Sequence, residues 1–147
     1  MIKYYWDDFT PGWTYASLPR ALSADALVRF ARGSDPQIYH TDPEAAKATS
    51  FGGLIASGWQ TCGVMMRQMC DGYLVESACV GSPGLDELRW LKPVRPGDAL
   101  RLRAEVLEQT PSRKLPNRGT VKFRWQVLNQ GDEVVCAIIG RQLFKRR

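Results

Sequence analysis

Residues 51–69 read FGGLIASGWQTCGVMMRQM, and this stretch decides what kind of fold the chain can adopt. Apolar side chains fall on nearly every side of the helix that the run 54–69 predicts. A helix that is apolar all round is a buried helix. The run is too short, and too often interrupted by glycine and glutamine, to span a membrane. Other parts of the chain must therefore surround this helix.

Period-two patterns after about residue 85 predict strands that could surround this helix. Apolar and charged residues alternate in two stretches, 100–106 and 121–127, which is typical of half-buried antiparallel strands. A turn at 129–132 leads to a last strand over 133–144. Prolines 93 and 96 end an earlier strand that includes Trp90. These segments predict a sheet that follows the buried helix in sequence.

The first half of the chain reads as a mixture of short elements. The expected elements are a strand over 13–22, a helix over 24–32 capped by Ser23 and ended by Gly33, and a helix over 44–48 after Asp42-Pro43. One buried helix and at least five mostly antiparallel strands predict an α+β fold in which the sheet curls around the helix. The length of 147 residues fits one domain over 1–147.

Composition excludes several classes of protein. The chain is 44% hydrophobic and 24% charged, as in ordinary globular proteins. Its start has no apolar signal-peptide core and no run is long enough to cross a membrane, so we expect a cytoplasmic protein without membrane contact. The net charge of +5 is scattered rather than gathered in one stripe. Such a field suits an anionic small molecule, and we expect no nucleic-acid partner.

The four cysteines predict neither disulfides nor a metal site. They are Cys62, Cys70, Cys79 and Cys136. No C-x-x-C pair occurs among them, and the chain has a single histidine to help them. We interpret all four as reduced and mostly buried.

Asp35 and His40 are the candidate catalytic residues. A lone histidine is more often structural than catalytic, but His40 is expected in a loop between two short helices, five residues after Asp35. Pro36 restricts Asp35 to extended geometry, so this loop can aim both side chains at one point. A carboxylate and an imidazole converging on a water can act as the base for hydration or hydrolysis. The nearby Asp42 is interpreted as a helix cap.

The glycine-rich start of the buried helix is the second candidate element. Glycine lets a backbone approach a ligand closely, and free N–H groups at a helix start favour an oxygen that gains negative charge. The alternative is that these glycines only make a turn and allow tight packing. Ser57 lacks the G-x-S-x-G context of a serine nucleophile.

Two runs, DPQIYHTDPEAAK (35–47) and FGGLIASG (51–58), with LKPVRPGD (91–98) and SRKLPNRG (112–119), resemble the MaoC-like family, which includes R-specific enoyl-CoA hydratases. The resemblance covers most of the chain. It implies a hot-dog fold, an antiparallel sheet wrapped around one long helix. It also implies that Asp35 and His40 activate water, that the Gly58 N–H polarises a thioester carbonyl, and that two subunits pair into a dimer with sites near the interface.

Three positions depart from the family pattern: Pro36 directly follows Asp35, Ser57 replaces a histidine, and Met66 stands where some hydratases have serine. The expected activity is reversible addition of water to a trans-2-enoyl-CoA, with no cofactor besides the CoA thioester substrate. An acyl-CoA thioesterase and a non-catalytic acyl-CoA or acyl-carrier binding module remain alternatives, and acyl chain length stays open.

Candidate substrate-binding residues lie at two places in the sequence. Ser57 and Trp59 flank the oxyanion glycine, although a residue such as Trp59 is more often plain core than part of a pocket. Arg113, Lys114 and Arg118 form a basic loop that either meets the CoA phosphates or is a solvent-exposed turn.

Overall fold

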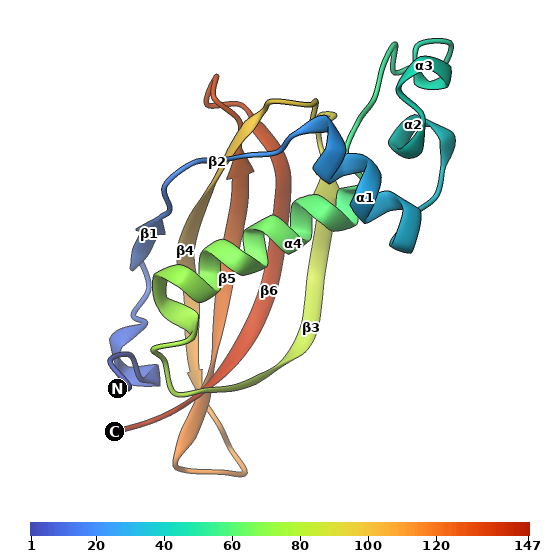
Figure 1. Cartoon of the computed structure of the whole chain (residues 1–147). Coiled ribbons are helices and arrows are strands. Elements are labelled where there is room, and N and C mark those ends of the chain that lie inside the picture. Colours follow the sequence, from blue (N-terminus) through green and yellow to red (C-terminus); the bar gives the residue numbers. More distant parts are fainter.

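A single antiparallel sheet forms the framework of the computed structural model, which describes residues 1–147 (Figure 1). The strand order is β1–β4–β5–β6–β3, and the short β2 also pairs with β4. The strands are β1 (Thr14–Ala16), β2 (Arg20–Ala21), β3 (Cys79–Trp90), β4 (Ala99–Pro111), β5 (Arg118–Leu128) and β6 (Val134–Lys145). The outermost long strand, β3, contains three register shifts against β6.

One long helix lies across a face of this sheet, and three short helices gather near its N-terminal end (Figure 1). The helical elements are η1 (Trp6–Asp8), α1 (Ala24–Ser34), α2 (Ile38–Thr41), α3 (Pro43–Ala46), α4 (Gly58–Met69) and the π-helical turn η2 (Cys70–Leu74). This arrangement confirms the predicted α+β hot-dog fold. No helix is both long and apolar enough to cross a membrane.

The core lies between α4 and the inward-facing residues of the central strands. Ala104 stands opposite Trp125, and Val106 stands opposite Phe123. All four are at most 2% exposed, which confirms the alternation predicted for both strands. Burial of each large apolar side chain contributes about 1.5–3 kcal/mol to folding. Met69 of α4 is enclosed in the same cluster, so the sheet and the helix stabilise each other.

The predicted start of the central helix was wrong by one turn. Residues 54–56 are buried but extended, and α4 begins at Gly58. Their backbone bonds to other segments: the Ile55 N–H donates to Tyr39 and the Ala56 N–H to Val94. The apolar side chains of residues 54–56, which suggested a longer helix, belong instead to a buried extended segment. The helix is also not buried on every side, because Trp59 and Met66 are exposed.

Four predictions for the first half need correction. The strand expected over 13–22 is divided into β1 and β2, and the proline between them has no N–H to donate. The first helix continues through Gly33, whose φ is not positive, to Ser34. The helix expected over 44–48 spans Pro43–Ala46, and His40 lies within α2 rather than in a loop.

Candidate active site

The ends of two short helices bring Asp35 and His40 together. Asp35 caps the C-terminus of α1, and His40 lies on the last turn of α2. The His40 Nε2 is 3.3 Å from the Asp35 Oδ2, and the side chains are only 6% and 18% exposed. This close approach across the α1–α2 connection was predicted from the sequence spacing.

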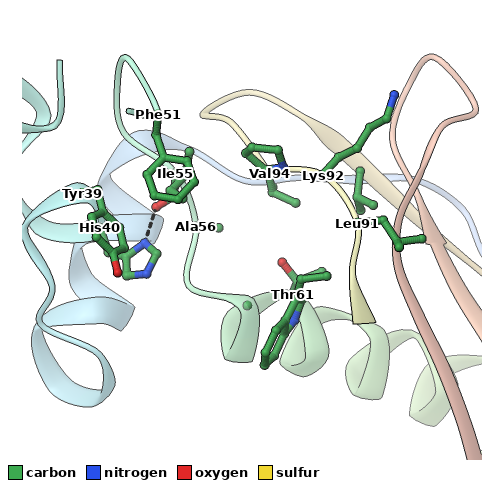
Figure 2. A pocket seen from close by; sticks show the side chains of 13 residues that line it. Tyr39, His40, Phe51, Ile55, Ala56, Thr61, Leu91, Lys92 and Val94 are labelled. Atoms are coloured by element: carbon green, nitrogen blue, oxygen red, sulfur yellow. Dashed lines mark hydrogen bonds between the residues drawn. The ribbon is translucent and has the colours of Figure 1, made fainter. Parts of the chain in front are cut away.

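The hydrogen bond made by the other ring nitrogen of His40, Nδ1, determines which of the two nitrogens carries the proton. Nδ1 lies 2.8 Å from the backbone oxygen of Ile55, as the dashed line in Figure 2 shows. A carbonyl oxygen only accepts, so Nδ1 holds a proton. In the neutral ring the Nε2 lone pair then faces the Asp35 carboxylate, and both of these atoms are acceptors. A water that donates one proton toward each of them fits this arrangement.

The Asp35 carboxylate is fixed from both sides. The Gln37 amide donates to Oδ1 and the Ser57 hydroxyl donates to Oδ2, each at 2.7 Å. The Gln37 bond, with smaller contributions from Ser57 and the nearby His40, lowers the pKa of Asp35 below that of an ordinary aspartate, and partial burial opposes this only in part. Asp35 is therefore ionised at neutral pH.

Ser57, which was predicted to contact the substrate, does not line the pocket. Its side chain is completely buried, its hydroxyl donates to Asp35, and its oxygen caps α4 by accepting from the Trp59 N–H. Ser57 therefore joins the start of α4 to the carboxylate rather than facing the pocket. This link crosses 22 residues of sequence, so no local pattern indicated it.

Gly58 is the first residue of α4, and its N–H donates to no acceptor in the chain. The N-terminus of a helix carries partial positive charge, so this N–H can hold an oxygen that becomes negative. A Cβ on Gly58 would lie 2.3 Å from the ring of Trp90. Glycine is required here because the indole packs directly against its Cα.

A mostly apolar cavity of about 360 Å³ opens beside these groups (Figure 2). Its wall includes His40 and Gly58, whereas Asp35 reaches it only through the histidine. The lining residues are Tyr39, His40, Phe51, Ile55, Ala56, Gly58, Thr61, Trp90, Leu91, Lys92, Pro93, Val94 and Val135. Such a shape suits a ligand that is largely apolar with one polar reacting end.

Several lining residues were not predicted as site residues. Residues 91–94 belong to a run that resembles the MaoC-like family, but no pocket role was predicted for them, and Thr61 was recognised only as part of a helix. They become site residues because β3 ends beside the start of α4, where Trp90 covers Gly58. Trp59, a predicted substrate contact, is outside the cavity and packs edge-on against Trp90 with 5.1 Å between ring centroids.

The sequence profile of the family described as "MaoC like domain" matches residues 9–124. The chain belongs to the MaoC-like family. A crystal structure of the MaoC-like dehydratase from Rhodospirillum rubrum is 37% identical, superimposes with a TM-score of 0.92, and is covered over 99% of both chains. The uncharacterized protein YdeM of Bacillus subtilis is 33% identical over 107 residues, which is 73% of this chain and 76% of YdeM.

A more distant protein shares the fold. The R-hydratase PhaJ1 from Pseudomonas aeruginosa has a TM-score of 0.75 at 24% identity, with 97% of this chain and 86% of that chain covered. At this level the likeness concerns the architecture alone. It places this chain among hot-dog proteins that carry a long helix on an antiparallel sheet.

The basic loop of this MaoC-like chain lies far from its own pocket. Arg113 and Lys114 are in the connection between β4 and β5, and Arg118 begins β5. Figure 1 shows this hairpin at the opposite end of the sheet from α2 and α3. The three side chains are therefore not brought to the cavity within one chain, and their contact with CoA stays a prediction.

No three His, Cys, Asp or Glu side chains are grouped as metal ligands. All four cysteines carry free thiols.

Proposed function

We propose that this protein hydrates trans-2-enoyl-CoA thioesters reversibly. The observation that carries the proposal is the pair of acceptor atoms, His40 Nε2 and Asp35 Oδ2, held 3.3 Å apart next to an apolar cavity. Membership of the MaoC-like family supports a hydratase or dehydratase activity. The similar Rhodospirillum rubrum protein is itself named a dehydratase.

In the proposed reaction the thioester carbonyl oxygen accepts a hydrogen bond from the Gly58 N–H. This interaction draws electrons toward the oxygen and makes the β-carbon electrophilic. A backbone donor of this kind contributes roughly 10²–10³-fold to the rate. The acyl chain lies against the apolar wall of the pocket.

Asp35 and His40 hold the attacking water and remove one of its protons. The oxygen forms a bond to the β-carbon, the double-bond electrons move toward the thioester, and a proton returns to the α-carbon. Water is thereby added with its atoms balanced, and the reverse sequence eliminates it. General acid–base help of this kind is worth roughly 10²–10⁴-fold. The thioester accepts the electrons during the reaction, so the proposal needs no cofactor.

The proposal includes a second copy of the chain. β3 is a 12-residue strand with one side of its backbone unpaired, and it exposes Val80 and Leu85. Pairing with another β3 would cover this edge. The same strand ends at Trp90 in the pocket wall, so a partner there would lie beside the site.

The test compares Asp35→Asn and His40→Ala with the parent protein on a panel of trans-2-enoyl-CoA substrates. Loss of enoyl absorbance measures hydration, and a thiol reagent detects free CoA. We expect both variants to hydrate about 10²–10⁴-fold more slowly. Release of thiol without a 3-hydroxyacyl product would instead identify a thioesterase, and binding without turnover would identify a binding module.

Asp42→Asn is the matched control. Asp42 is an exposed carboxylate in the same segment, and it caps α3 by accepting from the Glu44 and Ala45 N–H groups at 3.0 Å each. This variant removes one charge near the dyad but none of the proposed machinery. Unchanged turnover in Asp35→Asn and His40→Ala, on a substrate that the parent hydrates, would show that the dyad assignment is wrong.

A further inference from the structure

Thr61 places an unpartnered hydroxyl in the wall of the cavity. The residue is only 2% exposed, and its hydroxyl takes part in no hydrogen bond within the chain. The unpartnered side-chain atoms that are fully enclosed by the protein are the amide oxygens of Gln60, Gln68 and Gln142, and the Thr61 hydroxyl is not one of them. Figure 2 shows the hydroxyl oxygen of Thr61 directed into the cavity below Val94, on the side of Thr61 that faces Ala56 and His40.

The surroundings of this hydroxyl are apolar. Ala56, Val94 and Val135 line the same cavity. Water can satisfy the hydroxyl in the free protein, but a purely hydrocarbon acyl chain would displace that water and leave the donor unpaired. Valine has almost the same shape and would avoid this cost. A threonine here therefore favours a ligand that carries an oxygen at this point.

The position of Thr61 relative to Gly58 indicates where that oxygen lies. The two residues are three apart on α4 and therefore share a face of the helix. Three residues correspond to about 4.5 Å along a helix axis. An extended acyl chain advances about 1.25 Å for each carbon–carbon bond of about 1.5 Å, so this length corresponds to roughly three to four bonds. An oxygen bound by Thr61 would thus sit a few carbons beyond a thioester carbonyl bound at Gly58.

The charge of the pocket indicates which kind of oxygen. Lys92 is the lysine of the pocket wall, and it is already paired with Glu133. A carboxylate on the acyl chain would find no free lysine or arginine there. A hydroxyl or ketone oxygen needs only the neutral donor that Thr61 provides.

We propose that Thr61 is a specificity-determining residue that hydrogen-bonds an uncharged oxygen on the acyl chain. The preferred substrates are then short enoyl thioesters with a hydroxyl or ketone near carbon 4, 5 or 6. A cavity of about 360 Å³ holds roughly a dozen water-sized groups, which agrees with a short chain. This inference rests on the proposed hydratase function and adds its substrate class.

The test uses six-carbon trans-2-enoyl-CoA substrates, one unsubstituted and three with a hydroxyl at carbon 4, 5 or 6. We expect the parent protein to prefer one hydroxylated member by at least tenfold in kcat/KM. Thr61→Val should lower kcat/KM much more on the preferred hydroxylated substrate than on the unsubstituted one and so remove this preference, and Thr61→Ser should retain it. No preference in the parent, or an equal loss on all four substrates in Thr61→Val, would overturn the proposal.

Calorimetric binding separates this proposal from the hydratase proposal. Saturated hexanoyl-CoA and its hydroxylated counterparts cannot be hydrated, so their relative affinities report on Thr61 alone. Thr61-dependent preference without any hydration of enoyl substrates would remove the hydratase and keep the oxygen-binding subsite. Hydration of enoyl substrates without any Thr61-dependent preference would keep the hydratase proposal and remove the oxygen-binding subsite. If Thr61→Val does not fold, Thr61→Ala against Thr61→Ser makes the same comparison.

Discussion

Ser57→Ala removes one hydroxyl that serves both the fold and the dyad. The Ser57 hydroxyl donates to Asp35 Oδ2 at 2.7 Å, and its oxygen accepts from the Trp59 N–H at 3.3 Å. Loss of an N-cap costs about 1 kcal/mol. Loss of a hydrogen bond to a charged group costs about 1.5–3 kcal/mol. Because Asp35 keeps its Gln37 bond and some contact with solvent, we expect a combined loss of about 2 kcal/mol in the free energy of unfolding.

The same substitution should change the pH dependence. Without the Ser57 donor, the pKa of Asp35 rises from its lowered folded-state value. A lowered folded pKa stabilises the protein above the unfolded value of about 3.9, and this stabilisation disappears as pH falls through the folded pKa. The stability difference caused by Asp35 should therefore be largest at neutral pH and shrink in acid. The acid limb of kcat/KM should move to higher pH.

Turnover at neutral pH should also fall, by roughly 10- to 100-fold, because the carboxylate is no longer held in one orientation. Ser23→Ala is the matched control. Ser23 caps α1 by accepting from the Ala26 N–H at 3.1 Å, and it contacts neither dyad residue. It should lose about 1 kcal/mol of stability with unchanged kinetics.

Urea unfolding at several pH values and pH–rate profiles of the parent protein and both variants provide the measurements. If Ser57→Ala behaves like Ser23→Ala, with lower stability but the same turnover and the same acid limb, Ser57 does not position Asp35. The role derived from its buried hydrogen bond would then be refuted.

Three further predictions concern other parts of the molecule. Gly58→Ala should lower the free energy of unfolding in urea by about 1–3 kcal/mol, because its Cβ would overlap the Trp90 ring. Adding Trp90→Ala to this variant should recover part of the loss. If the two losses are additive, this overlap is not the cause. Tyr73→Phe should cost about 1–3 kcal/mol with unchanged kcat/KM, since the buried Trp125 Nε1–H loses its acceptor at 3.0 Å; an unaltered stability would argue against that bond. Leu85→Lys adds a charge to the exposed β3 edge and should convert the proposed dimer to a monomer by light scattering, whereas a dimer that persists would exclude pairing through this strand.

Local sequence patterns predicted the parts of the fold that depend on periodicity. The alternation over 100–106 and 121–127 gave the two central strands, because the side chains of a strand point alternately to opposite faces. The buried helix was predicted in type but not in its start, since a buried extended segment and a buried helix are both apolar. A helix boundary depends on which partners the backbone finds, and Ile55 and Ala56 find theirs on other segments.

The candidate site divides in the same way. The spacing of Asp35 and His40 was sufficient to predict their approach, because five residues joined by a short turn keep two side chains close. The Ser57 hydroxyl reaches Asp35 across 22 residues, and the Ile55 carbonyl reaches His40 across 15. Contacts of this range form only when packing brings separate segments together.

The sequence by itself indicated the two central strands, the buried helix and the closeness of Asp35 and His40, since each of these depends on residues only a few positions apart. Only the tertiary structure decided how the start of that helix works. It showed that residues 54–56 are extended, that Ser57 holds Asp35, that Trp90 covers Gly58, and that Thr61 faces the cavity. The physical reason is that burial and hydrogen bonding at this point depend on β3 and α1, which the chain places beside α4 only after folding.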